Sequence, residues 1–344
     1  MTIRFGLRLP ACEPAREIGR QAAAAEAAGF DSVWVPDSQL LWRDAWVTLS
    51  AVAMATSKIT IGVGVTTPVT RHPTATACAI TSLNELSGGR ATLGIGQGDS
   101  SVRLIGLKPS KIAEMRAAIE TIRGLGAGRW MDLSGRKMRM KSAEGLTAAA
   151  PIYLAASGPK MLQLAGEVAD GALLLAGVDA VNLDYAIGNV RTGAERAGRP
   201  ISDIDVMLGA HCYVGEDWRT ARKLARPFAA LFAMYWPAAL EAAGIKVPTP
   251  RPMDGLYPDV NHCEDWDRAV ELTDWVPDDV LELFCSKYTL MGTAREIIAQ
   301  LETVISRGVN HFYLLGFKSY ELPTDVAQAF AREVIPYFRS HTQT

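Results

Sequence analysis

Short apolar segments of strand length alternate with longer segments of helical periodicity along most of the chain. The short segments predict eight strands of parallel type, at residues 3–9, 31–36, 59–67, 90–95, 152–155, 171–175, 204–214 and 311–315. Helices are predicted between them; the first of these (14–28) begins at Pro14 and stops before Gly29, which are typical start and stop residues. This alternation favours a parallel sheet, and eight repeats favour a (β/α)8 TIM barrel over a doubly wound sheet.

The predicted third strand is unusual because two glycines interrupt it. In the stretch KITIGVGVTTPVTRHP, residues 58–73, Gly62 and Gly64 break a run of isoleucines and valines. Glycine inside a strand commonly marks a bulge or a close backbone approach. The stretch therefore leaves two interpretations open: tight packing against a neighbouring element, or the approach of a flat ligand where the strand meets a polar loop.

Two segments interrupt the alternation of strand and helix. Residues 130–140 predict an inserted hairpin, and the segment from about 236 to 284 is rich in prolines and aromatic residues. Prolines stiffen a loop and aromatic side chains supply flat apolar walls, so this segment is either a cover over a substrate or a cap that buries its aromatics against the barrel rim. We expect a single barrel domain over residues 1–344, with a substrate-covering insertion at about 236–284.

Composition and charge exclude several classes of protein. The 344 residues are 49% hydrophobic and 21% charged, which provides a large core and is not typical of disorder. A net charge of −2 argues against nucleic acid or an anionic membrane surface as a partner. The five cysteines are dispersed without a CxxC pair, and the sequence contains neither a signal peptide nor an apolar span of membrane length. These features predict a cytoplasmic protein with reduced thiols.

A cluster of glycines at residues 94–98, GIGQG, raises the alternative of a dinucleotide-binding sheet. A true fingerprint opens a helix at once and is followed by an acidic residue at the end of the next strand. Here residues 99–102 are expected to precede a loop, and the next helix is predicted only from about residue 111. The context therefore argues against the dinucleotide-binding interpretation.

In a barrel, functional side chains lie at the C-terminal ends of the strands. The candidate residues at the predicted strand ends are Arg8, Pro10, Asp37, Ser38, Gly64 to Thr67, Gly96 to Asp99, and Ala156 to Pro159. Ser157 and Gly158 directly precede a helix, so they either bind a phosphate through backbone N–H groups or form an ordinary serine cap before Pro159. His211 belongs either to an acid–histidine pair or to the core.

Motifs for other chemistries are missing from the sequence. It contains no HxH, HExxH or acidic cluster for a metal, and no GxSxG motif for a serine hydrolase. Glycine-rich walls with few acid–base groups favour a reaction that an organic cofactor carries.

Three motifs together resemble the bacterial luciferase-like superfamily. They are TRHP at residues 70–73, LNELSGGRATLGIGQGD at 83–99 and SGPKMLQLAGEVADG at 157–171. Within the superfamily, the chain is most similar to coenzyme F420-dependent reductases such as the methylenetetrahydromethanopterin reductases. The resemblance implies a (β/α)8 barrel with insertions, usually dimeric, that holds a flavin or 5-deazaflavin at the C-terminal ends of its strands.

The resemblance also implies roles for single residues. A non-prolyl cis peptide at Gly64–Val65, followed by Thr66, would support the deazaflavin ring from behind. Asp37 and Ser38 would flank the ring. Two further groups would complete the cofactor site: Gly96, Gln97, Gly98 and Asp99 beside the cofactor, and Ala156, Ser157 and Gly158 around its phosphate.

Two positions depart from the pattern of the family. Several F420-dependent members carry a histidine where this chain has Ser38, and the methanopterin reductases carry a glutamate where it has Arg8. Serine is a poor acid or base at neutral pH, and arginine reverses the charge, so we do not expect methylenetetrahydromethanopterin as the substrate.

The expected function is that of an F420-dependent oxidoreductase, a homodimer that acts on a small-molecule substrate with Asp37, Ser38 and Arg8 as candidate catalytic residues. It would transfer a hydride between C5 of the deazaflavin and a C=C, C=N or C=O group. Two alternatives remain: an FMN-dependent monooxygenase on the same scaffold, and a flavin- or F420-binding protein without catalysis.

Overall fold

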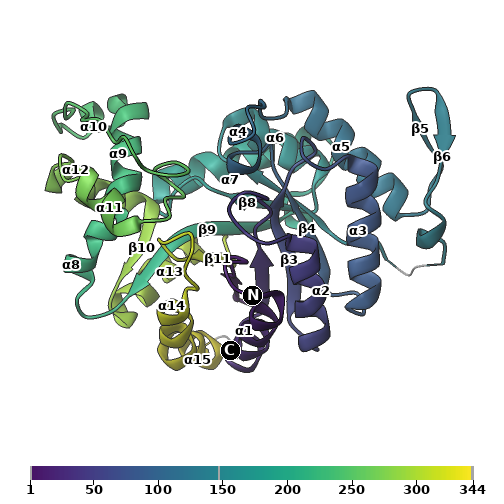
Figure 1. Cartoon of the computed structure of the whole chain (residues 1–344), viewed down its shortest axis with the longest axis horizontal. Coiled ribbons are helices and arrows are strands. Elements are labelled where there is room, and N and C mark those ends of the chain that lie inside the picture. Colours follow the sequence, from purple (N-terminus) through teal and green to yellow (C-terminus); the bar gives the residue numbers. More distant parts are fainter. Residues whose placement is uncertain (1, 146–147, 342–344) are drawn as a thin grey trace.

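Eight parallel strands close into a barrel in the computed structural model, which describes residues 2–145 and 148–341 (Figure 1). Residues 1, 146–147 and 342–344 of the expected domain lie outside the described ones. The sheet order is β9-β11-β1-β2-β3-β4-β7-β8, and pairing of β8 with β9 closes it. The barrel strands are β1 Arg4–Arg8, β2 Ser32–Val35, β3 Thr60–Thr66, β4 Ala91–Ile95, β7 Ile152–Ala156, β8 Gly171–Leu174, β9 Asp205–Val214 and β11 His311–Leu315. The predicted (β/α)8 barrel is confirmed.

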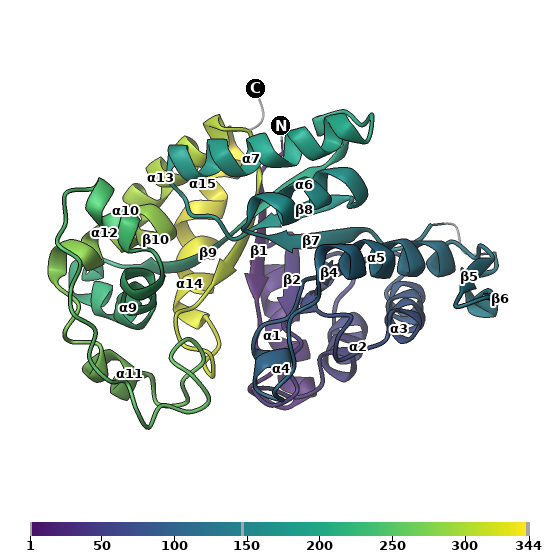
Figure 2. The ribbon, with the colours of Figure 1, turned by 90° about the horizontal axis from the view of Figure 1, so that it is seen from above.

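Helices cover the outside of the barrel, and capping side chains explain where several of them begin (Figure 2). Asp44 and Asp179 accept hydrogen bonds from the first backbone N–H groups of α2 and α7, and Thr293 forms a capping box with Glu296 at the start of α13. These outer helices are α1 Ala15–Ala27, α2 Ala45–Ala55, α3 Pro73–Leu86, α5 Ile112–Gly126, α6 Pro159–Val168, α7 Ala180–Arg196, α13 Ala294–Ser306, α14 Thr324–Ala329 and α15 Ile335–His341, with a π-helical turn at Phe330–Val334 and 3₁₀ turns at Lys141–Ala143 and Ile201–Asp203.

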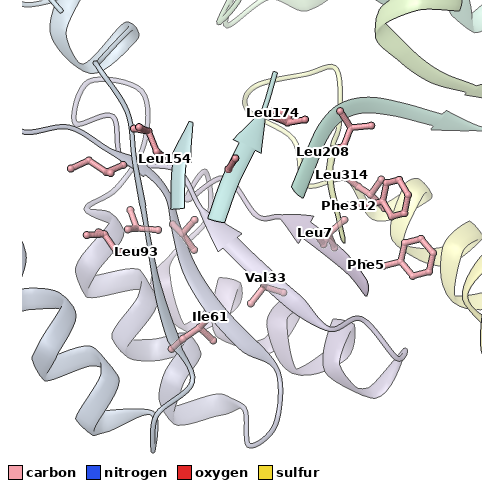
Figure 3. Close-up of a cluster of buried hydrophobic side chains, with 14 of the residues drawn as sticks. Phe5, Leu7, Val33, Ile61, Leu93, Leu154, Leu174, Leu208, Phe312 and Leu314 are labelled. Carbon is pink, nitrogen blue, oxygen red and sulfur yellow. The ribbon is translucent and has the colours of Figure 1, made fainter. Parts of the chain in front are cut away.

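Side chains of the strands point alternately to two separate cores. The outer core lies between strands and helices, and Figure 3 shows its strand members, among them Phe5, Val33 and Leu208. The inner core fills the barrel axis with Trp34, Tyr153, Leu173, Met207 and Tyr313. The barrel is therefore packed below its C-terminal rim.

A network of polar side chains fills the lower end of the barrel, where the strands begin. Arg4 forms an ion pair with Asp205, which also accepts hydrogen bonds from the Tyr153 hydroxyl and from His311 Nδ1, the latter at 2.9 Å. His311 Nε2 in turn lies 3.4 Å from Ser32 Oγ. Burial raises the pKa of Asp205, but the hydrogen bonds from His311 and Tyr153 and the charge of Arg4 outweigh it and lower the pKa to about 2.

The surroundings of Gly62 explain why a glycine interrupts the third strand at this position. A Cβ atom at this position would lie 2.2 Å from Cε3 of Trp34, whose indole N–H donates to Ser32 Oγ at 2.9 Å. The packing interpretation is confirmed at Gly62, because the indole occupies the space that a side chain would need.

The segment between β9 and β10 forms a lobe with a core of its own beside β9 and β10 (Figures 1 and 2). Trp266 and Trp275 are buried in this core, whereas Tyr235, Trp236 and Tyr257 are exposed. Its elements are α8 Trp218–Ala221, a 3₁₀ turn Arg222–Ala225, α9 Arg226–Tyr235, α10 Pro237–Ala242, α11 Trp266–Leu272 and α12 Asp278–Tyr288.

The predicted hairpin at residues 130–140 is confirmed. It consists of β5 Met131–Leu133 and β6 Arg136–Met138, which are antiparallel and project from the opposite end of the molecule from the lobe (Figure 1).

Among the elements that were not predicted are two short ones. β10 Thr289–Gly292 pairs with the second half of β9 outside the barrel, and its four residues follow α12 without a break that the sequence pattern could signal. α4 Ser100–Arg103 directly follows the glycine cluster, where a loop was expected. The five cysteines are free, and no helix within the described ranges is both long and apolar enough to cross a membrane.

Candidate functional site

Three half-buried apolar side chains form a floor at the C-terminal rim of the barrel. Val65, Ala155 and Leu315 pack on top of the inner core and come from three different strands. The neighbouring glycines leave room for the Val65 side chain. A Cβ at Gly94 would lie 3.0 Å from Cγ1 of Val65, and one at Gly96 would lie 3.0 Å from its Cγ2. The floor therefore presents a surface of small apolar groups beneath the strand ends.

The bond between Gly64 and Val65 is cis, as the resemblance to F420-dependent reductases implied. The Tyr313 hydroxyl donates to the Gly64 carbonyl oxygen at 3.0 Å, and the backbone N–H of Gly96 donates to the Thr66 carbonyl at 2.9 Å. The pairing of β3 with β4 is irregular at this point. Contacts from β11 and β4 thus fix the backbone that carries Val65.

Asp37 and Ser38 follow β2 and lie beside the apolar floor through contacts with β3 and α4. The Thr66 hydroxyl donates to Asp37 Oδ2 at 2.7 Å, and the Ser38 and Ser100 hydroxyls are hydrogen-bonded at 3.0 Å. Burial raises the pKa of Asp37 above its ordinary value, although the Thr66 hydrogen bond opposes this shift. A carboxyl group with a raised pKa at a barrel rim is typical of a functional site.

Arg8, the last residue of β1, lies over the ring of Trp42, with its guanidinium carbon 4.8 Å from the ring centroid. The Trp42 indole N–H donates to the Ser319 carbonyl at 2.8 Å. Trp42 was missed by sequence reasoning, because its partners come from β1 and from the loop after β11. Its only local signal is its place in the loop that follows Asp37.

His211 is held in an aromatic cluster without an acidic partner among the residues that the structure describes. Its Nδ1 lies 2.9 Å from the Gly316 carbonyl, and its ring packs against Phe228 and Phe317. Burial lowers the pKa of His211 to about 4. The core interpretation of His211 therefore holds.

Asp259 and His262 form an acid–histidine pair that was not predicted from the sequence. His262 Nδ1 lies 3.0 Å from Asp259 Oδ1, and the imidazole meets the Trp42 ring edge to face. Both residues belong to the loop between α10 and α11. The lobe thus reaches the rim beside Arg8.

The loop after β4 holds the four predicted cofactor residues in different ways. Gly96 abuts the apolar floor, and Gly98 adopts a φ of +103° that favours glycine. The Gln97 side-chain amide donates to the Ser110 carbonyl at 2.6 Å, so it ties the loop to the start of α5. Asp99 is exposed and paired with Arg103.

The segment from Ala156 to Gly158 leads from β7 into α6. The N-cap is Gly158, and no side chain caps this helix. The interpretation of Ser157 as an ordinary cap is therefore wrong: the serine lies one residue too early and is exposed. Backbone N–H groups of the first turn remain available to an anion.

These residues fit a flat organic cofactor better than a metal. The apolar floor, the polar groups at its edge and the uncapped helix start provide distinct places for a ring, its substituents and a phosphate. Within the parts of the chain that the structure describes, no three histidine, cysteine or acidic residues are grouped so that they could hold a metal ion.

Comparison with known proteins decides the family. The sequence profile of a family described as luciferase-like monooxygenase matches residues 1–311. The chain belongs to this luciferase-like family. The predicted superfamily is thereby confirmed, over most of the length of the chain.

Several luciferase-like relatives are reductases and dehydrogenases. A 5,10-methylenetetrahydromethanopterin reductase from Methanolobus tindarius is 32% identical over 310 residues, which cover 89% of this chain and 91% of the relative. An F420-dependent glucose-6-phosphate dehydrogenase from Nakamurella multipartita is 31% identical over 249 residues, which cover 67% and 73%. The solved coenzyme F420-dependent tetrahydromethanopterin reductase of Methanopyrus kandleri superposes with a TM-score of 0.77 at 24% identity, covering 98% of this chain and all of that one. This likeness confirms the fold.

Proposed function

We propose that this luciferase-like chain is an F420-dependent oxidoreductase, which transfers a hydride between C5 of the deazaflavin and a C=C, C=N or C=O group of an organic substrate. The observation that carries the proposal is the apolar floor of Val65, Ala155 and Leu315, with Asp37 at its edge and the open start of α6 beside Ala155. A flat ring with a phosphate tail matches this arrangement. Sequence relatives that are named as F420-dependent support the choice of cofactor.

The residues at the rim have separate roles in this proposal. The deazaflavin, when bound, supplies C5 as the hydride donor or acceptor. Asp37 and Ser38 polarise the reacting group, and the Thr66 hydroxyl holds the Asp37 carboxylate in place. Arg8 acts on the substrate from the side of β1.

The cofactor would contact residues from four strands. The cofactor-binding residues of the proposal are Asp37, Ser38, Gly64, Val65, Thr66, Gly96, Gln97, Gly98, Asp99, Ala156, Ser157 and Gly158. Exposed basic residues near α4, namely Arg103, Lys108 and Lys111, would attract the anionic oligoglutamate tail of F420.

The assembly and the lobe complete the proposal. We propose one barrel domain over residues 1–344, in which the insertion at about 236–284, a part of the lobe, covers the substrate. We also propose a homodimer and a cytoplasmic location. The contact between His262 of the lobe and Trp42 supports the covering role, because it brings the lobe to the rim.

Equilibration of the purified protein with F420 and with FMN, separately, tests the function. We expect tight binding of F420 and weak binding of FMN. The description of the family favours one rival, an FMN-dependent monooxygenase, and tight FMN binding with rapid oxygen consumption after reduction would establish it. F420 binding without hydride transfer to any of a broad panel of unsaturated and carbonyl compounds would instead indicate a binding protein.

A further inference from the structure

Arg8 is a cation at the mouth of the barrel, facing its axis. Phe5 and Leu7 belong to the outer core, so the alternation of β1 directs Arg4 and Arg8 inward. Arg4 lies at the lower end, where Asp205 neutralises it. Arg8 lies at the upper end, where β1 reaches the C-terminal rim of the barrel.

No acid in the described ranges neutralises Arg8, whose guanidinium forms neither an ion pair nor a hydrogen bond there. The titratable groups that shift its pKa are Tyr313 and Cys12, and Arg8 in turn acts on His211. Both are neutral at pH 7, since burial raises the pKa of Tyr313 to about 12 and also raises the pKa of Cys12. Burial lowers the pKa of Arg8 itself, because removing the guanidinium from water destabilises its charged form. No described acid offsets this cost.

The contacts of Arg8 orient it without using its donors. The Trp42 ring lies under the guanidinium, and the hydrogen bond from its indole to Ser319 fixes that ring. A guanidinium over an aromatic ring keeps the N–H groups along its edge available. Arg8 is thus preorganised, with a fork of donors and no acceptor.

The neighbouring titratable groups do not balance the charge of Arg8. Burial lowers the pKa of His211, and the charge of Arg8 adds to this shift. His211 is therefore neutral at pH 7, and Asp259 already pairs with His262. Among the described residues, none forms an ion pair with Arg8, which keeps its permanent charge.

We propose that Arg8 binds the carboxylate of the substrate, so that the substrate of the proposed oxidoreductase is an organic acid. A planar carboxylate matches the guanidinium fork and can accept two hydrogen bonds from it. The apolar floor beside Arg8 receives the uncharged part of the molecule. The term substrate rests on the proposed function, whereas the anion site rests on the contacts of Arg8.

The test compares benzoate with benzamide, which has nearly the same shape without the charge. Calorimetric titration of the F420-loaded protein is expected to show benzoate binding at least about tenfold more tightly, a difference of about 1.4 kcal/mol. Arg8→Met removes this preference and Arg8→Lys retains part of it. Arg20→Met, which removes an exposed charge on α1, leaves the preference unchanged and controls for net charge.

Two results would overturn the carboxylate site. One is a benzoate preference that survives Arg8→Met in a variant with an unchanged melting temperature. The other is a tenfold loss of F420 affinity in Arg8→Met without any change in the benzoate preference, which would assign Arg8 to the cofactor. The same titration of the cofactor-free protein separates the two proposals, since benzoate selectivity there does not depend on whether F420 binds.

Discussion

The two ends of the barrel interior hold charged groups in opposite circumstances. At the lower end, Asp205 meets Arg4, His311 and Tyr153, and its pKa falls to about 2. At the rim, burial raises the pKa of Asp37, and Arg8 meets no described acid. At the lower end the charges of Arg4 and Asp205 neutralise each other, whereas neither Asp37 nor Arg8 forms an ion pair with a described residue.

This difference distinguishes charged groups that stabilise the fold from charged groups that serve a binding site. A buried charge with partners positions strands, while a charge that is desolvated without a partner lowers stability and is typical of a functional site. The same substitution, from aspartate to asparagine, should therefore have opposite effects on stability at the two ends.

The largest effect is expected for Asp205→Asn. The substitution leaves Arg4 without its counter-charge and weakens the bond from His311, so it should lower the free energy of unfolding by about 3 kcal/mol, at the low end for a buried pair because Arg4 is half-exposed. Urea denaturation measures the change. Asp184→Asn, which breaks an exposed pair with Arg307, is the matched control and should cost about 0–1 kcal/mol.

Acid should reveal the same network in the unmodified protein. The pKa of Asp205 is about 2 in the folded state against an ordinary 3.8, so its ionised form stabilises the fold above pH 4 and this contribution is lost as the pH falls through 2. The loss amounts to on the order of 2 kcal/mol. Urea denaturation at pH 5, 3 and 2 should show a gap between wild type and Asp205→Asn that closes with acid. Parallel curves would contradict this account of the lower end.

The sequence predicted the barrel because strand and helix periods are local properties. The contacts of the β3 glycines, in contrast, could not be predicted from local sequence. Gly62 accommodates Trp34 of β2, and Gly64 carries the cis bond and receives a hydrogen bond from Tyr313 of β11. These neighbours are distant in the sequence, so the pattern alone could not decide between packing and the approach of a ligand.

The rim was predicted as a set of strand ends but not as a set of contacts. Asp37 was a candidate because it follows a predicted strand, and Arg8 because it lies near the end of one. Trp42 was not, since its contacts with Arg8 and Ser319 join segments far apart in the chain. Gln97 was a cofactor candidate by resemblance, and the bond from its side chain to Ser110 could not be foreseen.

Substitutions of Gly158 test whether the start of α6 binds the phosphate of the cofactor. The φ of Gly158 is −83° and no atom beyond its two chain neighbours lies within 4 Å of the position of a Cβ. Gly158→Ala should therefore fold normally and bind F420 within about threefold of wild type. Gly158→Asp places a carboxylate where the phosphate is proposed to bind and should weaken F420 binding at least about tenfold, or 1.4 kcal/mol. An acidic residue at a helix N-terminus stabilises the helix, so unfolding should not explain the loss. Fluorescence titration with F420 measures both variants, and equal affinities would place the phosphate elsewhere.

Asp37→Asn is expected to have the smallest effect on stability and the opposite sign to Asp205→Asn. Because the folded state raises the pKa of Asp37, ionisation of this carboxyl destabilises the fold at neutral pH. Asparagine removes the buried charge and still accepts the hydrogen bond from the Thr66 hydroxyl, so the free energy of unfolding at pH 7 should rise by about 0–1 kcal/mol. The gain should vanish below pH 4, where the unfolded aspartate is also protonated, while hydride transfer with reduced F420 should slow at every pH. Urea denaturation at pH 7 and 3.5, together with the rate of F420 oxidation, measures both effects. A stability loss similar to that of Asp205→Asn would mean that Asp37 serves the fold, and that the two ends of the barrel do not differ in the way their charges suggest.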